Sequence, residues 1–144
     1  MNIMHNEHIA LTDITAIAQR ISHLIPPVRI ITLTGPLGAG KTTLAGALLH
    51  QLVGDAQGPF QSPTYTYLNA YQYDHKKVYH FDLYRLHSVD DFIQAGFDDY
   101  LFEEDSICII EWPEIIQHLI TENVCSITLD YGPNDTRYIS IKTN

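Results

Sequence analysis

The chain has 144 residues, 45% of them hydrophobic and 17% charged, which excludes a largely disordered protein and provides enough apolar surface for a core. This length is typical of one domain, so we expect residues 1–144 to form a single domain. Eight Lys and Arg against seventeen Asp and Glu give a net charge of −9, which argues against a broad electrostatic contact with a nucleic-acid backbone.

The first third of the chain predicts a helix, a strand and a second helix. Residues 14–25 carry apolar side chains at three- and four-residue steps after a capping residue, Thr12 or Asp13, and two prolines end this helix. Residues 28–34 form a β-branched run that favours a strand. After a glycine-rich stretch, residues 41–53 again have helical periodicity.

The middle of the chain predicts a β-hairpin followed by a short helix. Residues 65–73 and 77–83 are rich in residues that favour strands, and a polar turn joins them. Ser88, with an acidic residue three positions later, resembles a capping box for a helix through Ala95. The acidic stretch 98–105 is either a solvated turn or helix face, or a docking face for a basic partner.

The last third predicts a buried strand, a helix and two further strands. Residues 107–110 are a continuous apolar run before Glu111, which is typical of a strand buried on both faces of a parallel sheet. Residues 113–120 begin with proline and predict a helix, and residues 124–130 and 137–142 predict strands on either side of a turn. The elements together predict an α/β fold, a mixed sheet flanked by helices in three layers, with a β-hairpin.

The glycine-rich stretch between the first predicted strand and the second predicted helix matches G-x-x-x-x-G-K-[ST], the phosphate-binding loop (P-loop). Glycines let backbone N–H groups turn toward phosphate oxygens, and the following helix presents its positive end to the anion. The lysine of this pattern reaches the terminal phosphates, and the threonine offers a hydroxyl to Mg²⁺. We therefore predict a P-loop NTPase-like fold with Lys41 as a catalytic group and Thr42 as a metal ligand. The predicted nucleotide-binding residues of the loop are Gly35, Pro36, Leu37, Gly38, Ala39, Gly40, Lys41, Thr42 and Thr43. The alternative is an ordinary glycine turn beside a surface lysine.

Two carboxylates compete for the metal. A nucleotide hydrolase needs a carboxylate that holds Mg²⁺ and orients the attacking water. Glu111 ends the fully apolar strand, which we expect beside the phosphate-loop strand, so we assign Glu111 to the metal or its water shell. Asp82 ends a strand in which apolar and polar residues alternate, which suggests a half-exposed antiparallel strand. We assign Asp82 a second catalytic role, in the outer shell of the metal or on the water. The alternative for Asp82 is a carboxylate bound to its own loop.

Five further side chains have less specific patterns. Thr64 lies in a Ser-Pro-Thr segment of the kind that closes over a γ-phosphate, or in an ordinary turn. Trp112 is interpreted as a core or interface anchor, His80 as a structural histidine, and Arg137 as a candidate contact of adenine. For Arg85 the pattern leaves open a carboxylate, a phosphate or RNA as the partner.

The cysteines and the hydropathy pattern indicate a cytoplasmic protein. Cys108 and Cys125 have β-branched neighbours and are expected to be buried, reduced thiols. Residues 1–10 lack the basic-then-apolar order of a signal peptide, and no apolar run is long enough to cross a bilayer. We therefore expect no membrane contact.

Four motifs in the order of the chain resemble the TsaE family of small bacterial ATPases. They are Gly-Pro-Leu-Gly-Ala-Gly-Lys-Thr-Thr-Leu at 35–44, Ser-Pro-Thr-Tyr-Thr at 62–66, Tyr-His-Phe-Asp-Leu-Tyr-Arg-Leu at 79–86 and Ile-Ile-Glu-Trp-Pro-Glu at 109–114. That family serves the threonylcarbamoyladenosine (t6A) modification of tRNA. The resemblance extends over nearly the whole chain.

The resemblance implies a P-loop α/β domain that binds ATP and Mg²⁺ and hydrolyses ATP slowly. It also implies two protein partners, TsaD and TsaB, of which TsaD transfers the threonylcarbamoyl group, and an indirect link to tRNA through that complex. Hydrolysis would then reset the complex between turnovers. By motif match, the phosphate and Mg²⁺ contacts are Lys41 and Thr42, the essential carboxylates are Glu111 and Asp82, the aromatic beside the nucleotide is Trp112, and the switch segment is 62–66.

Three rival functions share the loop. A small-molecule kinase would need an acceptor pocket and a mobile lid that carries arginine, but the chain has four Arg and no segment long enough for such a lid. A GTPase would need an Asn-Lys-x-Asp segment for guanine, which does not occur. A non-catalytic nucleotide-sensing scaffold overlaps with the preferred function, since slow hydrolysis and control by a partner are two views of one behaviour.

Overall fold

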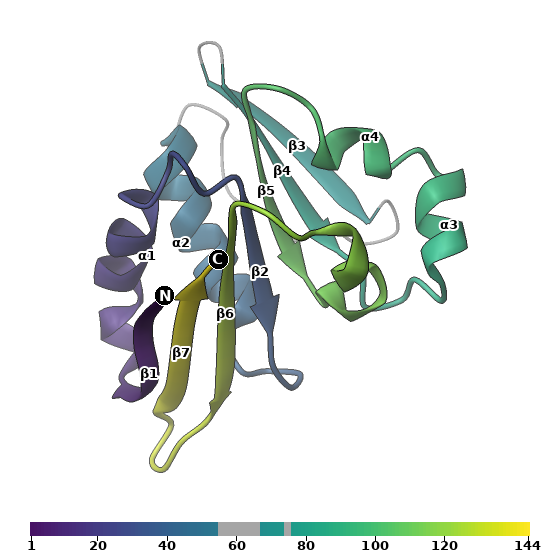
Figure 1. The fold of residues 1–144 in the computed structure, drawn as a ribbon. Helices are drawn as coiled ribbons and strands as arrows, with labels where there is room; N and C mark the ends of the chain where they lie inside the picture. Colours follow the sequence, from purple (N-terminus) through teal and green to yellow (C-terminus); the bar gives the residue numbers. More distant parts are fainter. Residues whose placement is uncertain (55–66, 74–75) are drawn as a thin grey trace.

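A seven-stranded sheet runs through the middle of the molecule (Figure 1). The computed structural model describes residues 1–54, 67–73 and 76–144. In these ranges the strands are β1 Asn2–Ile9, β2 Ile30–Thr34, β3 Leu68–Tyr73, β4 Lys76–Asp82, β5 Ser106–Glu111, β6 Val124–Tyr131 and β7 Arg137–Thr143. Their order across the sheet is β1-β7-β6-β2-β5-β4-β3.

The centre of the sheet is parallel and its edges are antiparallel. β2 pairs in parallel with β5 on one side and with β6 on the other, and β5 pairs in parallel with β4. β3 runs antiparallel to β4, and β7 runs antiparallel to both β6 and β1. The predicted mixed sheet with its β3–β4 hairpin is therefore confirmed, and so is the placement of the Glu111 strand beside the phosphate-loop strand.

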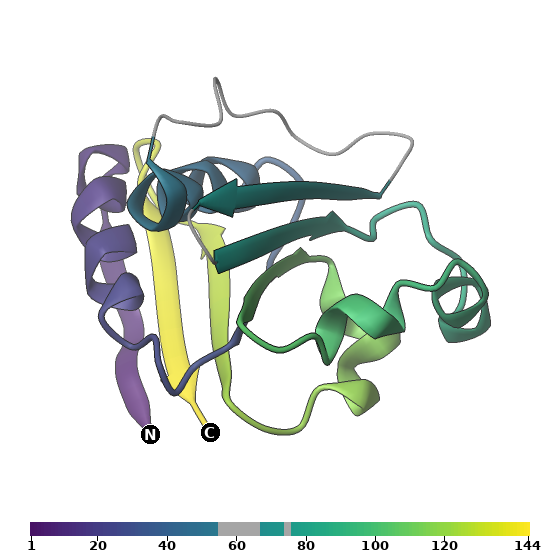
Figure 2. The same ribbon diagram turned by 90° about the horizontal axis from the view of Figure 1, so that it is seen from above.

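Helices cover both faces of the sheet (Figure 2). The helices on one face are α1 (Ile14–Ser22) and α2 (Lys41–Val53), preceded by the 3₁₀ turn η1 (Leu11–Asp13). Those on the other face are α3 (Val89–Gln94), α4 (Asp98–Leu101) and the 3₁₀ helix η2 (Pro113–Leu119). Each face has its own apolar core, one around Leu44 and Ile127 and the other around Phe81 and Phe92. The predicted three layers are confirmed.

Three expectations about local structure are corrected. Sequence analysis assigns no element to residues 1–10, but Asn2–Ile9 form the edge strand β1, in which only Met4 and Ile9 are buried. With so few buried positions, apolar and polar residues do not alternate along this segment. The segment is a strand because it pairs with β7. The helix expected over 14–25 ends at Ser22, and the helix expected over 113–120 is a 3₁₀ helix.

The strand that carries Asp82 is also not what the alternation suggests. β4 is exposed at Lys76 and Lys77 and half-buried at Asp82, but the four residues between them, Val78, Tyr79, His80 and Phe81, are all buried. Its polar residue His80 is fully buried and hydrogen-bonded, so a polar residue in this strand does not indicate an exposed face. β4 runs antiparallel to β3 but parallel to β5, which brings its carboxyl end to the same edge of the sheet as that of β5.

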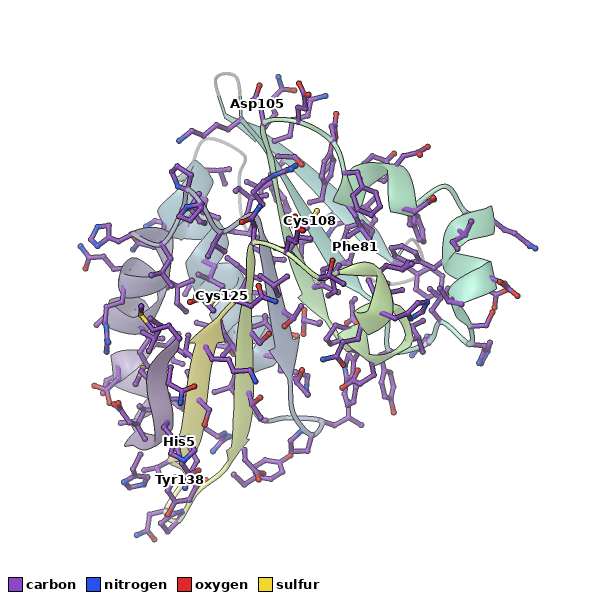
Figure 3. All side chains as sticks on the ribbon, in the orientation of Figure 1. His5, Phe81, Asp105, Cys108, Cys125 and Tyr138 are labelled. Carbon is purple, nitrogen blue, oxygen red and sulfur yellow. The ribbon has the colours of Figure 1, made fainter. Side chains whose placement is uncertain are left out.

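The two cysteines lie in different cores. Phe81 and Cys108 lie on the side of the sheet that carries α3 and α4, whereas Cys125 lies in the core beneath α1 and α2 (Figure 3). Both thiols are free and buried, and burial raises the pKa of Cys108 to about 12 and that of Cys125 to about 11. The expected burial of both cysteines is confirmed. In the described part of the chain, every helix is too short or too polar to cross a bilayer.

Gly35 lets the chain leave β2 in close contact with β6. Its φ is +151°, and a Cβ added to it would lie 2.2 Å from the carbonyl oxygen of Leu129. A side chain at this position would therefore push the start of the loop away from the sheet.

We expect Gly35→Ala to lower the free energy of unfolding by about 3 kcal/mol, because it combines a steric clash with an unfavourable backbone conformation. The matched control is Gly96→Ala, where φ is +80° but the space is open, and there the loss should be about 1 kcal/mol. Urea unfolding followed by circular dichroism measures both variants. Equal losses would show that the contact with Leu129 has no energetic weight.

Candidate functional site

The loop between β2 and α2 forms one wall of a pocket at the carboxyl end of the sheet. Gly38 and Gly40 have positive φ values of 78° and 108°, and α2 begins at Lys41. The pocket has a volume of about 230 Å³. Its lining combines the loop, the first turn of α2 and the ends of β4 and β5: Leu37, Gly38, Gly40, Lys41, Thr42, Thr43, Asp82, Tyr84, Glu111 and Trp112. The N-terminus of α2 therefore faces a cavity that anions favour.

Lys41 is held inside the loop. Only 4% of the residue is exposed, and its Nζ donates to the carbonyl oxygens of Gly35 at 2.6 Å and Pro36 at 2.7 Å. The same Nζ lies 4.2 Å from the centre of the Trp112 ring, a cation–π contact. Burial lowers the pKa of Lys41, and the negative charge of Glu111 opposes this shift. The amine thus binds two carbonyl oxygens of the loop, and among the described residues no carboxylate forms an ion pair with it.

Glu111 links helix α2, which follows the phosphate-binding loop, to the centre of the sheet. It is 1% exposed and stands at the end of β5, in register with Leu33 of β2 and Asp82 of β4. Its Oε1 accepts a hydrogen bond from the hydroxyl of Thr42 at 2.7 Å, and its Oε2 lies 2.7 Å from Nε2 of His80. The structure therefore joins the two predicted metal ligands, Thr42 and Glu111, in one contact.

His80 has a closer relation to the site than the sequence indicates. It is fully buried, as expected for a structural histidine, but its partner is the carboxylate of Glu111. The parallel register of β4 and β5 creates this contact, since His80 lies opposite Ile109, two residues before Glu111. No sequence spacing reveals such a pair, because 31 residues separate the two side chains.

Asp82 lies beside Glu111 and also binds its own loop. Its Oδ1 accepts a hydrogen bond from the backbone N–H of Tyr84 at 3.1 Å, the contact that the structural alternative predicts. The carboxylate nevertheless lines the pocket. Burial raises the pKa of Asp82, and the neighbouring negative charge of Glu111 raises it further. Two carboxylates therefore stand close together at the end of the sheet, where a cation would relieve their repulsion.

Two aromatic rings close the side of the pocket. Trp112 follows Glu111 with a positive φ of 58°, a conformation that turns the chain sharply at the end of β5. Its ring centre lies 4.8 Å from that of Tyr84, which is 50% exposed. Trp112 thus packs in the wall of the site rather than far from it. Sequence analysis missed Tyr84, although its position two residues after Asp82 is a usable signal.

One predicted residue lies away from this constellation, and another falls outside the described part of the chain. Arg137 is at the start of β7 and donates to the carbonyl oxygens of Ala39 at 3.0 Å and Gly38 at 3.3 Å, without lining the pocket. Thr64 and the rest of the segment 62–66 lie outside the described residues. Their predicted roles, and an adenine contact at Arg137, stay predictions.

The residues present fit a nucleotide with its magnesium ion. Hydroxyl and carboxylate oxygens are the ligands that Mg²⁺ prefers, and Thr42 and Glu111 supply them side by side. Among the described residues, no three His, Cys, Asp or Glu side chains form a complete metal site. A cation here would therefore need further oxygens from water or from phosphate, which agrees with a site that binds metal together with nucleotide.

Comparison with known proteins identifies the family of this chain. The family model "Threonylcarbamoyl adenosine biosynthesis protein TsaE" matches residues 9–139. A Rickettsia felis protein named tRNA threonylcarbamoyladenosine biosynthesis protein TsaE is 33% identical over the whole chain and 80% of its own length. The protein of that name from Haemophilus influenzae is 44% identical over 78% of this chain and 68% of its own.

A solved structure shares the fold. The crystal structure of YdiB from Bacillus subtilis superposes with a TM-score of 0.71 at 24% identity. The match covers 98% of this chain and 86% of that one. This similarity concerns the path of the backbone alone, and it agrees with the P-loop NTPase-like architecture predicted from the sequence.

We expect Asp82→Asn to stabilise the metal-free protein at pH 7. Because the pKa of Asp82 lies above its usual 3.8 in the folded state, the folded chain binds this proton more tightly than the unfolded chain does. Stability is then lost as the pH rises from 3.8 through the raised pKa, and the loss is complete only above that raised pKa. An asparagine keeps the acceptor for Tyr84 and carries no charge.

Urea unfolding in EDTA at a series of pH values measures this difference. The gain of Asp82→Asn over the unsubstituted protein should grow as the pH rises from 3.8 through the raised pKa, and should vanish as the pH falls below 3.8. Asp99→Asn, which removes an exposed carboxylate of α4, is the control. A variant that is less stable than the unsubstituted protein at pH 7 would contradict the assignment.

Proposed function

Because the chain belongs to the TsaE family of threonylcarbamoyl adenosine biosynthesis proteins, we propose that it is the ATP-binding and ATP-hydrolysing subunit of the t6A modification system. In this proposal residues 1–144 act as one Mg²⁺-dependent ATPase domain in the cytoplasm. The partners are TsaD and TsaB, and tRNA is reached through them. Hydrolysis is slow in the isolated chain and sustains turnover of the complex.

The observation that carries the proposal is the contact of Thr42 with Glu111 at the mouth of the loop pocket. Lys41 and backbone N–H groups of the loop would hold the phosphates of ATP, and Thr42 and Glu111 would hold Mg²⁺. When bound, Mg²⁺ supplies a positive charge that offsets the negative charge of the phosphates.

The remaining residues position and shield these groups. His80 fixes one oxygen of Glu111, so that the carboxylate presents the other oxygen to Thr42. Asp82 stands beside Glu111, where a carboxylate can accept a hydrogen bond from the attacking water. Trp112 and Tyr84 close the pocket beside Lys41 and exclude water from that side.

Nucleotide binding and turnover should separate among three variants. We expect Lys41→Ala to weaken ATP binding at least about tenfold, because the amine supplies charged hydrogen bonds to phosphate. Glu111→Gln and Asp82→Asn should retain binding but reduce hydrolysis about 10²-fold or more, since they act on the metal and the water. Calorimetry measures binding, and phosphate release measures turnover.

The control for these variants is Lys142→Ala, which removes an exposed lysine of β7. It should leave both binding and turnover unchanged. If Lys41→Ala bound ATP normally, the assignment of the phosphate site would be wrong. Efficient transfer of phosphate to a small acceptor in the absence of partners would instead indicate a kinase.

Hydrolysis should require both Mg²⁺ and the partner proteins. We expect EDTA to abolish phosphate release, and addition of TsaD and TsaB to raise it, because the metal offsets phosphate charge and the partners complete the working complex. The assay repeats phosphate release with and without each component, and it follows t6A formation in tRNA over many turnovers. Hydrolysis that is indifferent to TsaD and TsaB would contradict the accessory role.

A further inference from the structure

We propose that Arg137 and Tyr131, next to the turn of the β6–β7 hairpin, are positioning residues that hold the outer side of the phosphate loop and thereby aim its N–H groups into the pocket. This inference rests on the proposed function, in which these N–H groups bind the phosphates of ATP. Neither residue lines the pocket, so both act through the backbone of the loop.

Three consecutive carbonyl groups of the loop are bound by these two side chains. The hydroxyl of Tyr131 donates to the carbonyl oxygen of Leu37. Arg137 donates from Nη2 to Gly38 at 3.3 Å and from Nε to Ala39 at 3.0 Å. The contacts join residues that are more than 90 positions apart in the chain, so they depend on the β6–β7 hairpin lying against the loop.

Peptide geometry converts these outer contacts into an inner effect. In a trans peptide the C=O and the following N–H point in opposite directions. A carbonyl of Leu37 that is held by the hairpin therefore turns the N–H of Gly38 away from the hairpin, and the carbonyl of Ala39 does the same for Gly40. Gly38 and Gly40 both line the pocket. The N–H of Ala39 between them closes a turn to the oxygen of Pro36 at 3.1 Å.

The loop needs such support because of its composition. Glycine loses more conformational freedom on ordering than any other residue, so a loop with glycine at 35, 38 and 40 is costly to hold in one conformation. Contacts that fix the loop before the ligand arrives remove this cost from binding. The guanidinium reaches two carbonyl groups at once, which a lysine amine on a flexible stem does less well.

The two side chains also support each other. Nη1 of Arg137 donates to the carbonyl oxygen of Thr136 at 2.8 Å, and the guanidinium lies 5.3 Å from the centre of the Tyr131 ring. Three nitrogens of Arg137 thus bind backbone oxygens, and the side chain is anchored between its own strand and the loop. A positioning role therefore fits the geometry better than the adenine contact expected from the sequence.

Two ligands distinguish these roles. An adenine contact would matter for ATP but not for inorganic tripolyphosphate, which has no base. A positioning residue should matter equally for both, because both would bind the loop N–H groups. We therefore expect Arg137→Met to weaken the binding of ATP and of Mg²⁺-tripolyphosphate by the same factor, about tenfold, as measured by calorimetry.

Four further variants complete the experiment. Arg137→Lys keeps the charge but cannot donate to both loop carbonyl groups in the same geometry. Its affinity should lie between that of Arg137→Met and that of the unsubstituted protein. Tyr131→Phe removes one hydrogen bond and should lower the affinity for both ligands by about threefold. Arg20→Met, at an exposed position of α1, makes the same change of charge far from the loop and should have no effect. Val78→Ala tests whether general destabilisation changes affinity, and should leave it unchanged in the folded fraction.

Amide hydrogen exchange tests, without any ligand, whether Arg137 and Tyr131 hold the loop. Residues 35–43 should exchange faster in Arg137→Met than in the unsubstituted protein or in Arg20→Met. The inference would be overturned if Arg137→Met lost affinity for ATP alone or left exchange in the loop unchanged. It would also be overturned if Arg137→Lys kept full affinity. The unsubstituted protein could bind neither ligand while residues 35–43 still exchange faster in Arg137→Met. In that case the proposed function would be wrong, but the positioning role of Arg137 would be supported.

Discussion

The buried carboxylate of Glu111 is the group on which the rest of the site depends. A carboxylate at 1% exposure is tolerated only when both oxygens have partners, and here Thr42 and His80 provide them. These contacts join α2, β5 and β4 at one point. The first turn of the loop helix is therefore fixed to the centre of the sheet, and the place where a nucleotide would carry its metal is determined by the packing of the fold.

The phosphate loop is held from several directions. From within, Lys41 binds the carbonyl groups of Gly35 and Pro36. From outside, Arg137 and Tyr131 bind the carbonyl groups of the next residues. At its start the loop lies against the backbone of β6, in a space that only a glycine can occupy. A flexible sequence thus has a defined conformation, which is the condition for binding an anion through backbone N–H groups.

Most elements of the fold were predictable because their patterns are local. The apolar run before Glu111 predicted a buried parallel strand, and the glycine-rich stretch was correctly placed between a strand and a helix. Elements that depend on a distant partner were not predictable in this way. β1 is ordered by β7, and the exposure of β4 was misjudged because His80 is buried by a carboxylate from another strand. Tyr131 was missed for the same reason, since its hydroxyl binds Leu37 from far along the chain, whereas Tyr84 had a local signal in its position two residues after Asp82.

The sequence by itself determined the chemistry that is available: a glycine loop with Lys41 and Thr42, and two strand-end carboxylates. These groups are fixed by residue types at short spacings, and short spacings determine local backbone geometry. Only the tertiary structure decided which side chains touch. The register of β4 on β5 brings His80 to Glu111, and the β6–β7 hairpin brings Arg137 to the loop. Such contacts depend on strand order and register, which arise from the packing of both cores and leave no pattern in any single segment.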